Sequence, residues 1–125
     1  MAKTILIVDD NSHIRQALCN QFQREADFEV CGEAQNGKEA IAKAQELHPD
    51  LIVLDLSMPV MNGLDAAREL KRLMPTVPLM MYSLFGDAFA DQQAHLFGIS
   101  ELVSKSQPAA ILVSKARSLL SRTAA

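Results

Sequence analysis

A chain of 125 residues has the size of one domain, large enough to bury a sizeable core and too short for two, so we predict a single domain over residues 1–125. Its composition, 49% hydrophobic and 22% charged, is ordinary for a soluble globular protein. The formal net charge of −3 provides no basic field, so we expect no direct contact with nucleic acid.

The apolar runs of the sequence are too short for a signal peptide or a membrane span. The first apolar run, Ile5 to Val8, is closed at once by Asp9 and Asp10, so no signal peptide is predicted. No run approaches the roughly 18 apolar residues of a membrane span. Cys19 and Cys31 form no zinc-like spacing with each other or with histidine, which favours reduced thiols and a cytoplasmic location.

Apolar runs of strand length alternate with stretches of helical period along the first half of the chain. Residues 4–8 and 51–54 are uninterrupted runs of β-branched residues and leucine, typical of neighbouring central strands that are buried on both faces. Between them lie a helix capped by Asn11 or Ser12, a weaker strand over 28–33, and a second helix. His48-Pro49 ends this second helix, because a residue before proline disfavours the helical conformation.

The same alternation continues through the second half. A third helix ends at Pro75, and Pro78 opens a strand over 79–83. A fourth helix from about Asp87 to Leu96, closed by Gly98, precedes a short strand over 101–104. A last helix starts at Pro108. This pattern predicts an α/β fold with a parallel sheet and helices on both faces.

Polar side chains stand at the ends of four predicted strands. Asp9 and Asp10 end the first strand, Asp55 the third, Ser83 the fourth and Lys105 the fifth. Ligands of open parallel sheets bind outside the carboxyl ends of the strands. We therefore expect these five side chains to line one pocket.

Three neighbouring carboxylates repel one another unless a cation lies among them. Oxygen ligands favour Mg²⁺, with Mn²⁺ as the alternative, over zinc. Because Mg²⁺ commonly takes one or two carboxylates plus phosphate oxygens, Asp55 on the central strand is free to act as a nucleophile. Lys105 would then supply positive charge to phosphoryl oxygens, and Ser83 a hydrogen bond.

The acidic pair Asp9-Asp10, the loop over residues 55–63 (DLSMPVMNG), Ser83 and Lys105 together resemble the receiver domains of two-component response regulators. The resemblance covers nearly the whole chain. It implies a flavodoxin-like (βα)5 fold with a doubly wound, five-stranded parallel sheet in the order 2-1-3-4-5. It also implies that Asp10 ligates Mg²⁺ directly, that Asp9 does so mainly through water, and that the Ser57 carbonyl completes the site beside Asp55.

The resemblance further implies a signalling switch. Asp55 would accept a phosphoryl group from a histidine kinase, a phosphotransfer protein or a small phosphodonor. The chain would catalyse its own phosphorylation and dephosphorylation without being a conventional turnover enzyme. Ser83 and Lys105 would move inward and remodel the face of helix four, strand five and helix five. Pro59 and Gly63 would shape the loop without taking part in the chemistry.

The partners implied by the resemblance are an output domain or an effector protein. The stretches VCGEAQNG and MMYS are similar to those of receivers linked to helix-turn-helix output domains. The sequence leaves open whether the chain stands alone or belongs to a longer protein, and whether it dimerises through the helix four to helix five face.

Three positions concern how the switch would work. Leu102 stands where the family usually carries an aromatic switch residue, which argues against a rotating aromatic gate. Ser106 replaces the frequent proline after the lysine, so a cis peptide is not expected there. Phe85, close to the expected phosphoryl site, is a hypothetical shield against hydrolytic water.

Other functions of the same fold are weighed against this one. A receiver-like module that binds proteins without phosphorylation would have no Mg²⁺ affinity. A flavin carrier would require a hydroxyl-rich loop after the first strand, where this chain has Asp9-Asp10-Asn11. An aspartyl phosphatase with a DxD motif would require an acid at Ser57.

Overall fold

A single parallel sheet organises the molecule. The computed structural model describes residues 2–55, 63–83, 99–104 and 108–123. Its five strands lie in the order β2-β1-β3-β4-β5, as the resemblance implies. They are β1 (Lys3–Val8), β2 (Phe28–Ala34), β3 (Leu51–Asp55), β4 (Leu79–Ser83) and β5 (Glu101–Ser104).

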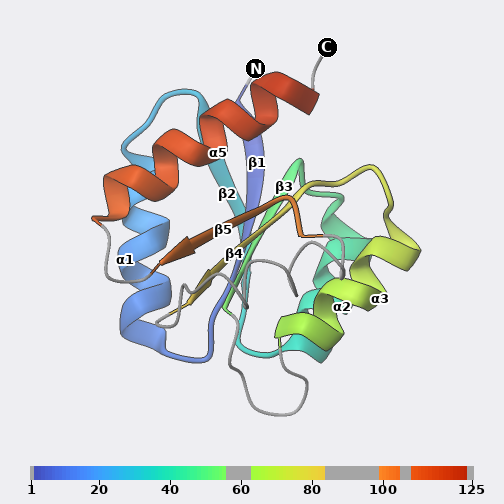
Figure 1. The fold of residues 1–125 in the computed structure, drawn as a ribbon. Helices are drawn as coiled ribbons and strands as arrows, with labels where there is room; N and C mark the ends of the chain where they lie inside the picture. The colour runs from blue at the N-terminus through green and yellow to red at the C-terminus, as the bar shows by residue number, and fades with distance from the viewer. Residues whose placement is uncertain (1, 56–62, 84–98, 105–107, 124–125) are drawn as a thin grey trace.

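Helices cover both faces of this sheet, as predicted. α1 (Ser12–Gln23) and α5 (Ala109–Thr123) lie on one face, and α2 (Gly37–Leu47) and α3 (Gly63–Leu73) lie on the other (Figure 1). The helix predicted from about Asp87 to Leu96, with its cap at Gly98, falls outside the described residues, so the full (βα)5 repeat stays a prediction. Among the described residues, no helix has the length and apolar character needed to span a bilayer.

Local sequence signals explain where α1 begins and where α2 ends. The Asn11 side chain caps α1 by accepting hydrogen bonds from the main-chain N–H groups of His13 at 2.9 Å and Ile14 at 3.1 Å. His48 ends α2 in the left-handed conformation, with φ of 50°, and its N–H bonds to the Ala44 carbonyl at 2.9 Å. Both boundaries agree with those predicted.

The two faces of the sheet are packed with side chains of different size. The cluster under α1 and α5 holds large residues such as Phe22 and Phe28, whose rings meet edge to face at 5.2 Å between centroids. The cluster under α2 and α3 is rich in alanine, at positions 34, 40, 44, 66 and 67. Strands β1 and β3 are buried on both sides, as their uninterrupted apolar sequences predict.

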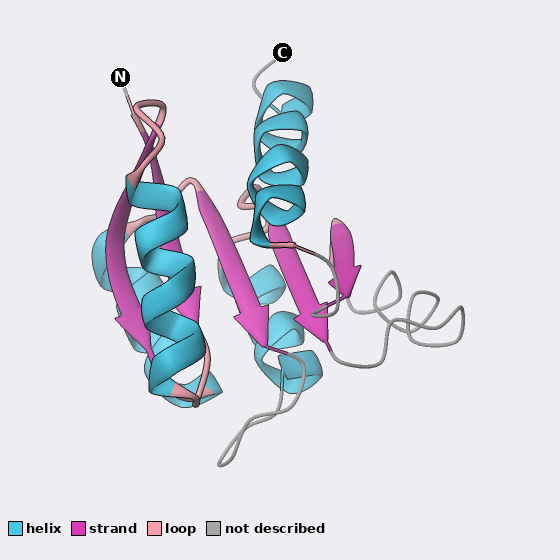
Figure 2. Ribbon diagram, turned by 90° about the vertical axis from the view of Figure 1, so that its left-hand side faces the viewer, coloured by secondary structure: helices cyan, strands magenta, loops and turns pink. Residues whose placement is uncertain are grey.

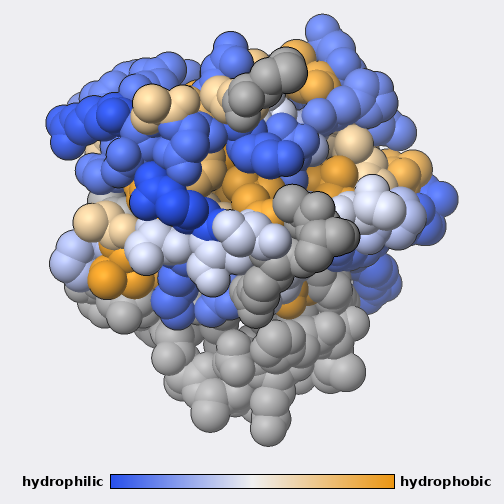
Figure 3. Space-filling model, turned by 90° about the horizontal axis from the view of Figure 1, so that it is seen from above, coloured by the Kyte–Doolittle hydropathy of each residue, from blue (hydrophilic) through white to orange (hydrophobic). Residues whose placement is uncertain are grey.

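Because the strands are parallel, all their carboxyl ends lie on one side of the sheet and all their amino ends on the other. We call these two sides the carboxyl edge and the amino edge. All strands point the same way, so their carboxyl ends share the lower edge in Figure 2, and both termini lie at the opposite, amino edge. Figure 3 views the molecule from the amino edge, where hydrophilic and hydrophobic residues are mixed. Val8 pairs with Leu54, so the residues that follow them, Asp9 and Asp55, come to the same level of the carboxyl edge.

Candidate functional site

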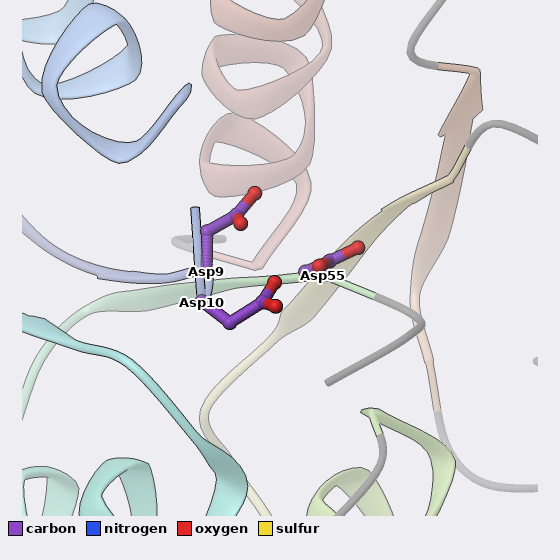
Figure 4. A group of neighbouring side chains, drawn as sticks. All are labelled: Asp9, Asp10 and Asp55. Carbon is purple, nitrogen blue, oxygen red and sulfur yellow. The ribbon is translucent and has the colours of Figure 1, made fainter. Parts of the chain in front are cut away.

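Three aspartates gather at the carboxyl edge of the sheet. Asp9 and Asp10 follow β1, and Asp55 is the last residue of β3 (Figure 4). One carboxylate oxygen from each lies within 4.8 Å of the other two. Asp9 is 0% exposed and Asp55 3% exposed, whereas Asp10 is exposed to solvent. Two buried acids and one solvent-facing acid therefore share one small volume.

The carboxylate of Asp9 is held by two hydrogen-bond donors from different parts of the chain. The Asn11 main-chain N–H donates to its Oδ1 at 2.8 Å, and the Tyr82 hydroxyl donates to its Oδ2. The main chain of Asp9 is tied as well. Its N–H donates to the Ala34 carbonyl at 3.0 Å, and Arg15 Nη1 donates to its carbonyl at 2.7 Å. Strands β1, β2 and β4 and helix α1 thus fix this residue together.

Arg15 and Tyr82, which both donate hydrogen bonds to Asp9, have different electrostatic roles. Arg15 reaches from α1, and its Nε also donates to Glu33 Oε1 at 3.0 Å, so its charge is shared between β1 and β2. Burial raises the pKa of Tyr82 far above its ordinary value, and the bond to Asp9 and the charges of Asp9, Asp55 and Asp10 raise it further. Tyr82 is therefore a neutral donor.

The donor set fits a hard cation. Three carboxylates at this separation repel one another strongly, and the burial of two of them increases the repulsion because water screens it poorly. A cation among them would remove that repulsion. Oxygen ligands of this kind suit magnesium or manganese. The cluster could therefore hold a metal ion, as the sequence predicts.

The other residues assigned to the site are placed as follows. Ser83 is the last residue of β4, and its main chain pairs with Ser104 at the same edge. Leu102 lies in β5, paired with Met81, and Gly63 is the first residue of α3. For Ser83 and Leu102 the structure describes the main chain only. The remaining assignments lie outside the described residues: Ser57, Pro59, Phe85 and Lys105.

Sequence reasoning missed the part played by Tyr82. The predicted role of the strand LMMYS is to place Ser83 at the site, and no role is predicted for its tyrosine. A signal was available, because a buried tyrosine hydroxyl needs a hydrogen-bond partner. In a parallel sheet the residue paired with Asp55 on β4 is Tyr82, so a carboxylate at this edge was the nearest candidate partner.

This chain is similar in sequence and in fold to known response regulators. The family model described as the response regulator receiver domain matches residues 5–117. The chemotaxis protein CheY of Thermotoga maritima is 37% identical over 105 residues, which cover 84% of this chain and 87% of CheY. The structure of a LuxR-family two-component response regulator from Aurantimonas sp. SI85-9A1 has a TM-score of 0.92 and 26% identity, covering 97% of this chain and 86% of that one.

Some relatives are much longer than this chain. The response regulator protein VraR of Staphylococcus aureus is 41% identical over 85 residues, which cover 68% of this chain but only 41% of VraR. The chain thus spans less than half of that relative. The match of the family model over most of the sequence, together with the acidic cluster at the carboxyl edge, shows that this chain belongs to the family of response regulator receiver domains.

Proposed function

We propose that the chain is a phosphoacceptor switch in which Asp55 takes up a phosphoryl group in a Mg²⁺-dependent reaction. The observation that carries this proposal is the meeting of Asp9, Asp10 and Asp55 within 4.8 Å at the carboxyl edge. Asp55 ends a fully buried central strand, so its position is set by the core of the protein. We infer that residues 1–125 form one receiver domain.

The three acids differ in exposure, and this supports different roles. Asp10 is exposed and can ligate Mg²⁺ directly, while Asp9, buried and held by two donors, contributes mainly through a metal-bound water. Asp55 and the Ser57 carbonyl complete the proposed ligand set. A bound Mg²⁺ would supply positive charge among the three carboxylates and would offset the negative charge of the phosphoryl oxygens. Mn²⁺ could replace it.

The proposed step is a direct transfer to a carboxylate. A carboxylate oxygen of Asp55 attacks the phosphorus of a kinase phosphohistidine, the P–N bond breaks, and its electron pair stays on the imidazole nitrogen. The product is an acyl phosphate on Asp55. Lys105 and Ser83 would hold its oxygens, and Pro59 and Gly63 would shape the loop. Attack by water at phosphorus reverses the switch, and Phe85 would limit the approach of that water.

The proposed partners are a histidine kinase or a phosphotransfer protein on the input side and an output domain or effector on the other. VraR and the LuxR-family regulator support an output domain of the helix-turn-helix kind, since VraR extends well beyond the region that this chain matches. The face that includes β5 and α5 would carry the signal. With Leu102 in place of an aromatic residue, we propose that the signal starts from Ser83 rather than from a rotating ring.

A phosphotransfer assay tests this function directly. The protein is incubated with acetyl phosphate, with and without Mg²⁺, and its intact mass is measured. We expect the mass of one phosphoryl group to be added only with Mg²⁺, and not at all in Asp55→Asn. Asp50→Asn, which alters an aspartate at the other edge of β3, should react like the wild type. If the wild-type chain neither binds Mg²⁺ nor gains mass, the alternative of a phosphorylation-independent binding module is correct.

A further inference from the structure

We propose that Tyr82 is a positioning residue of the metal site: its hydroxyl holds the Asp9 carboxylate facing the other two acids, and so sets the affinity for Mg²⁺. This inference rests on the proposed function, because it assigns a role toward the ion that Asp9, Asp10 and Asp55 would bind. It concerns a residue of β4, a strand that supplies no carboxylate to the cluster.

The fold leaves Tyr82 little freedom to do anything else. Its main chain pairs with that of Asp55 in the neighbouring strand. Its side chain is 3% exposed and belongs to the core cluster under α1 and α5, with Ile7 and Val53 from β1 and β3. A ring packed in this way cannot swing to solvent without opening the core. The hydroxyl is therefore delivered to Asp9 by the same packing that builds the sheet.

The two donors to Asp9 act on different oxygens. Asn11 approaches Oδ1 from the turn just after β1, and Tyr82 approaches Oδ2 from a position 73 residues along the chain. Together they fix the carboxylate against rotation about its side-chain bonds. Each of these bonds uses one of the roughly four acceptor sites of an ionised carboxylate, one on each oxygen.

Without such donors, repulsion from Asp10 and Asp55 would favour turning the Asp9 carboxylate away from the cluster. Because the hydrogen bonds orient the Asp9 carboxylate before the ion binds, less conformational entropy is lost on Mg²⁺ binding. Outer partners that orient metal ligands change affinity by roughly 10- to 100-fold when removed.

The test is a double-mutant cycle on Mg²⁺ affinity measured by isothermal titration calorimetry. The four proteins are the wild type, Tyr82→Phe, Asp9→Asn and the variant with both changes. Phenylalanine keeps the ring and removes only the hydroxyl. We expect Tyr82→Phe to bind Mg²⁺ about tenfold more weakly than the wild type. In the Asp9→Asn background the same change should have no further effect, because Tyr82 acts through Asp9.

Thr4→Val is the matched control. It also removes a hydroxyl that donates to an aspartate, since Thr4 Oγ1 donates to Asp50 Oδ2 at 3.1 Å, but this pair lies at the amino edge of the sheet. Thr4→Val should leave Mg²⁺ affinity unchanged. Equal affinity in wild type and Tyr82→Phe would overturn the inference, as would the same loss in the Asp9→Asn background. Failure of the wild type to bind Mg²⁺ would instead overturn the proposed function.

A second measurement needs no variant. Tyr82 is the only tyrosine and the chain has no tryptophan, so the intrinsic fluorescence of the protein comes from this ring. We expect Mg²⁺ to change this fluorescence with the same midpoint as in calorimetry, because a charge arrives beside the carboxylate that the hydroxyl contacts. Fluorescence that stays constant while calorimetry records binding would contradict the proposal, even if Tyr82→Phe does not fold.

Discussion

Aspartates stand at both edges of the sheet, and their surroundings are opposite. At the amino edge, Asp50 accepts hydrogen bonds from the Thr4 main-chain N–H at 2.8 Å and the Thr4 hydroxyl at 3.1 Å. Asp27, before β2, accepts two from Arg117, at 2.8 and 3.1 Å. At the carboxyl edge, the carboxylates of three aspartates lie within 4.8 Å of one another: Asp9, Asp10 and Asp55. Asp50 and Asp27 are thus each bonded to a distant segment, whereas three aspartates gather at the carboxyl edge.

The comparison shows that the neighbours of an aspartate decide what it does. At the amino edge each carboxylate joins two segments that are distant in sequence, so its attraction to donors stabilises the fold. At the carboxyl edge the donors to Asp9 hold the carboxylate beside two like charges, an arrangement that a cation would stabilise. Variants at the two edges should therefore separate metal binding from stability.

The largest expected effect is on metal binding. Replacing both Asp9 and Asp10 by asparagine should weaken Mg²⁺ binding by at least about a hundredfold. Removal of a residue that only orients a metal ligand already weakens binding by up to roughly a hundredfold, and the loss of two carboxylates should cost more. Asp50→Asn should bind Mg²⁺ as the wild type does. Calorimetric titration of the three proteins measures this. Equal weakening in Asp50→Asn would mean that the two edges are not separate.

Metal should also stabilise the wild type against unfolding. An ion that binds only the folded state at 100 times its dissociation constant adds about 2.7 kcal/mol to the free energy of unfolding. Urea titrations with Mg²⁺ and with a chelator measure the difference. The gain should disappear in the variant that lacks both Asp9 and Asp10, and persist in Asp50→Asn. An equal gain in all three proteins would place the ion elsewhere.

Loss of the Asp50 carboxylate should act on stability alone. Asp50→Ala removes the acceptor for the Thr4 N–H and hydroxyl, which join the start of β1 to the residue before β3. We expect the free energy of unfolding to fall by about 1 kcal/mol, the usual net value of such a bond. The check is urea unfolding without metal. A change in Mg²⁺ affinity with no change in the free energy of unfolding would contradict the assignment of stability to the amino edge and of metal binding to the carboxyl edge.

The smallest effect concerns Asp27 and pH. The hydrogen bond from Arg117 lowers the pKa of Asp27 below its ordinary value of 3.8. A lowered folded-state pKa gives stability that is present above the unfolded pKa and is lost as pH falls through the folded one. Asp27→Asn should therefore be slightly less stable than the wild type at neutral pH.

Urea unfolding of both proteins across the acidic range checks this. Asp27→Asn is preferable to a change at Arg117, whose guanidinium also lies 5.5 Å from the centre of the Phe28 ring. The difference in stability should disappear in acid. A difference that is constant at every pH would show that the ion pair does not titrate with folding.

The fold was largely predictable because its signals are local. The apolar strands over 4–8 and 51–54, the Asn11 cap and the end of α2 at His48 all follow from short stretches of sequence. The meeting of Asp9, Asp10 and Asp55 was predictable too, since carboxyl ends of parallel strands share an edge. The roles proposed for Lys105, Ser57, Pro59 and Phe85 stay predictions.

The contact between Tyr82 and Asp9 was not predicted, because it depends on register and side-chain direction across three strands. A buried tyrosine hydroxyl needs a hydrogen-bond partner, but the sequence MMYS does not specify which group that partner is. The contact depends on the pairing of Tyr82 with Asp55 and on its packing in the same core cluster as Ile7. The Arg15 bond to the Asp9 carbonyl is of the same kind, since it needs the placement of α1 against β1 and β2.

Mapping the modified residue shows whether Asp55 is the phosphoryl acceptor. After reaction with acetyl phosphate and Mg²⁺, borohydride reduces an aspartyl phosphate to homoserine, and peptide mass spectrometry shows which residue was changed. We expect homoserine at position 55 alone, formed only when Mg²⁺ is present. Homoserine at position 9 or 10, or at position 55 in equal amount without Mg²⁺, would contradict this expectation.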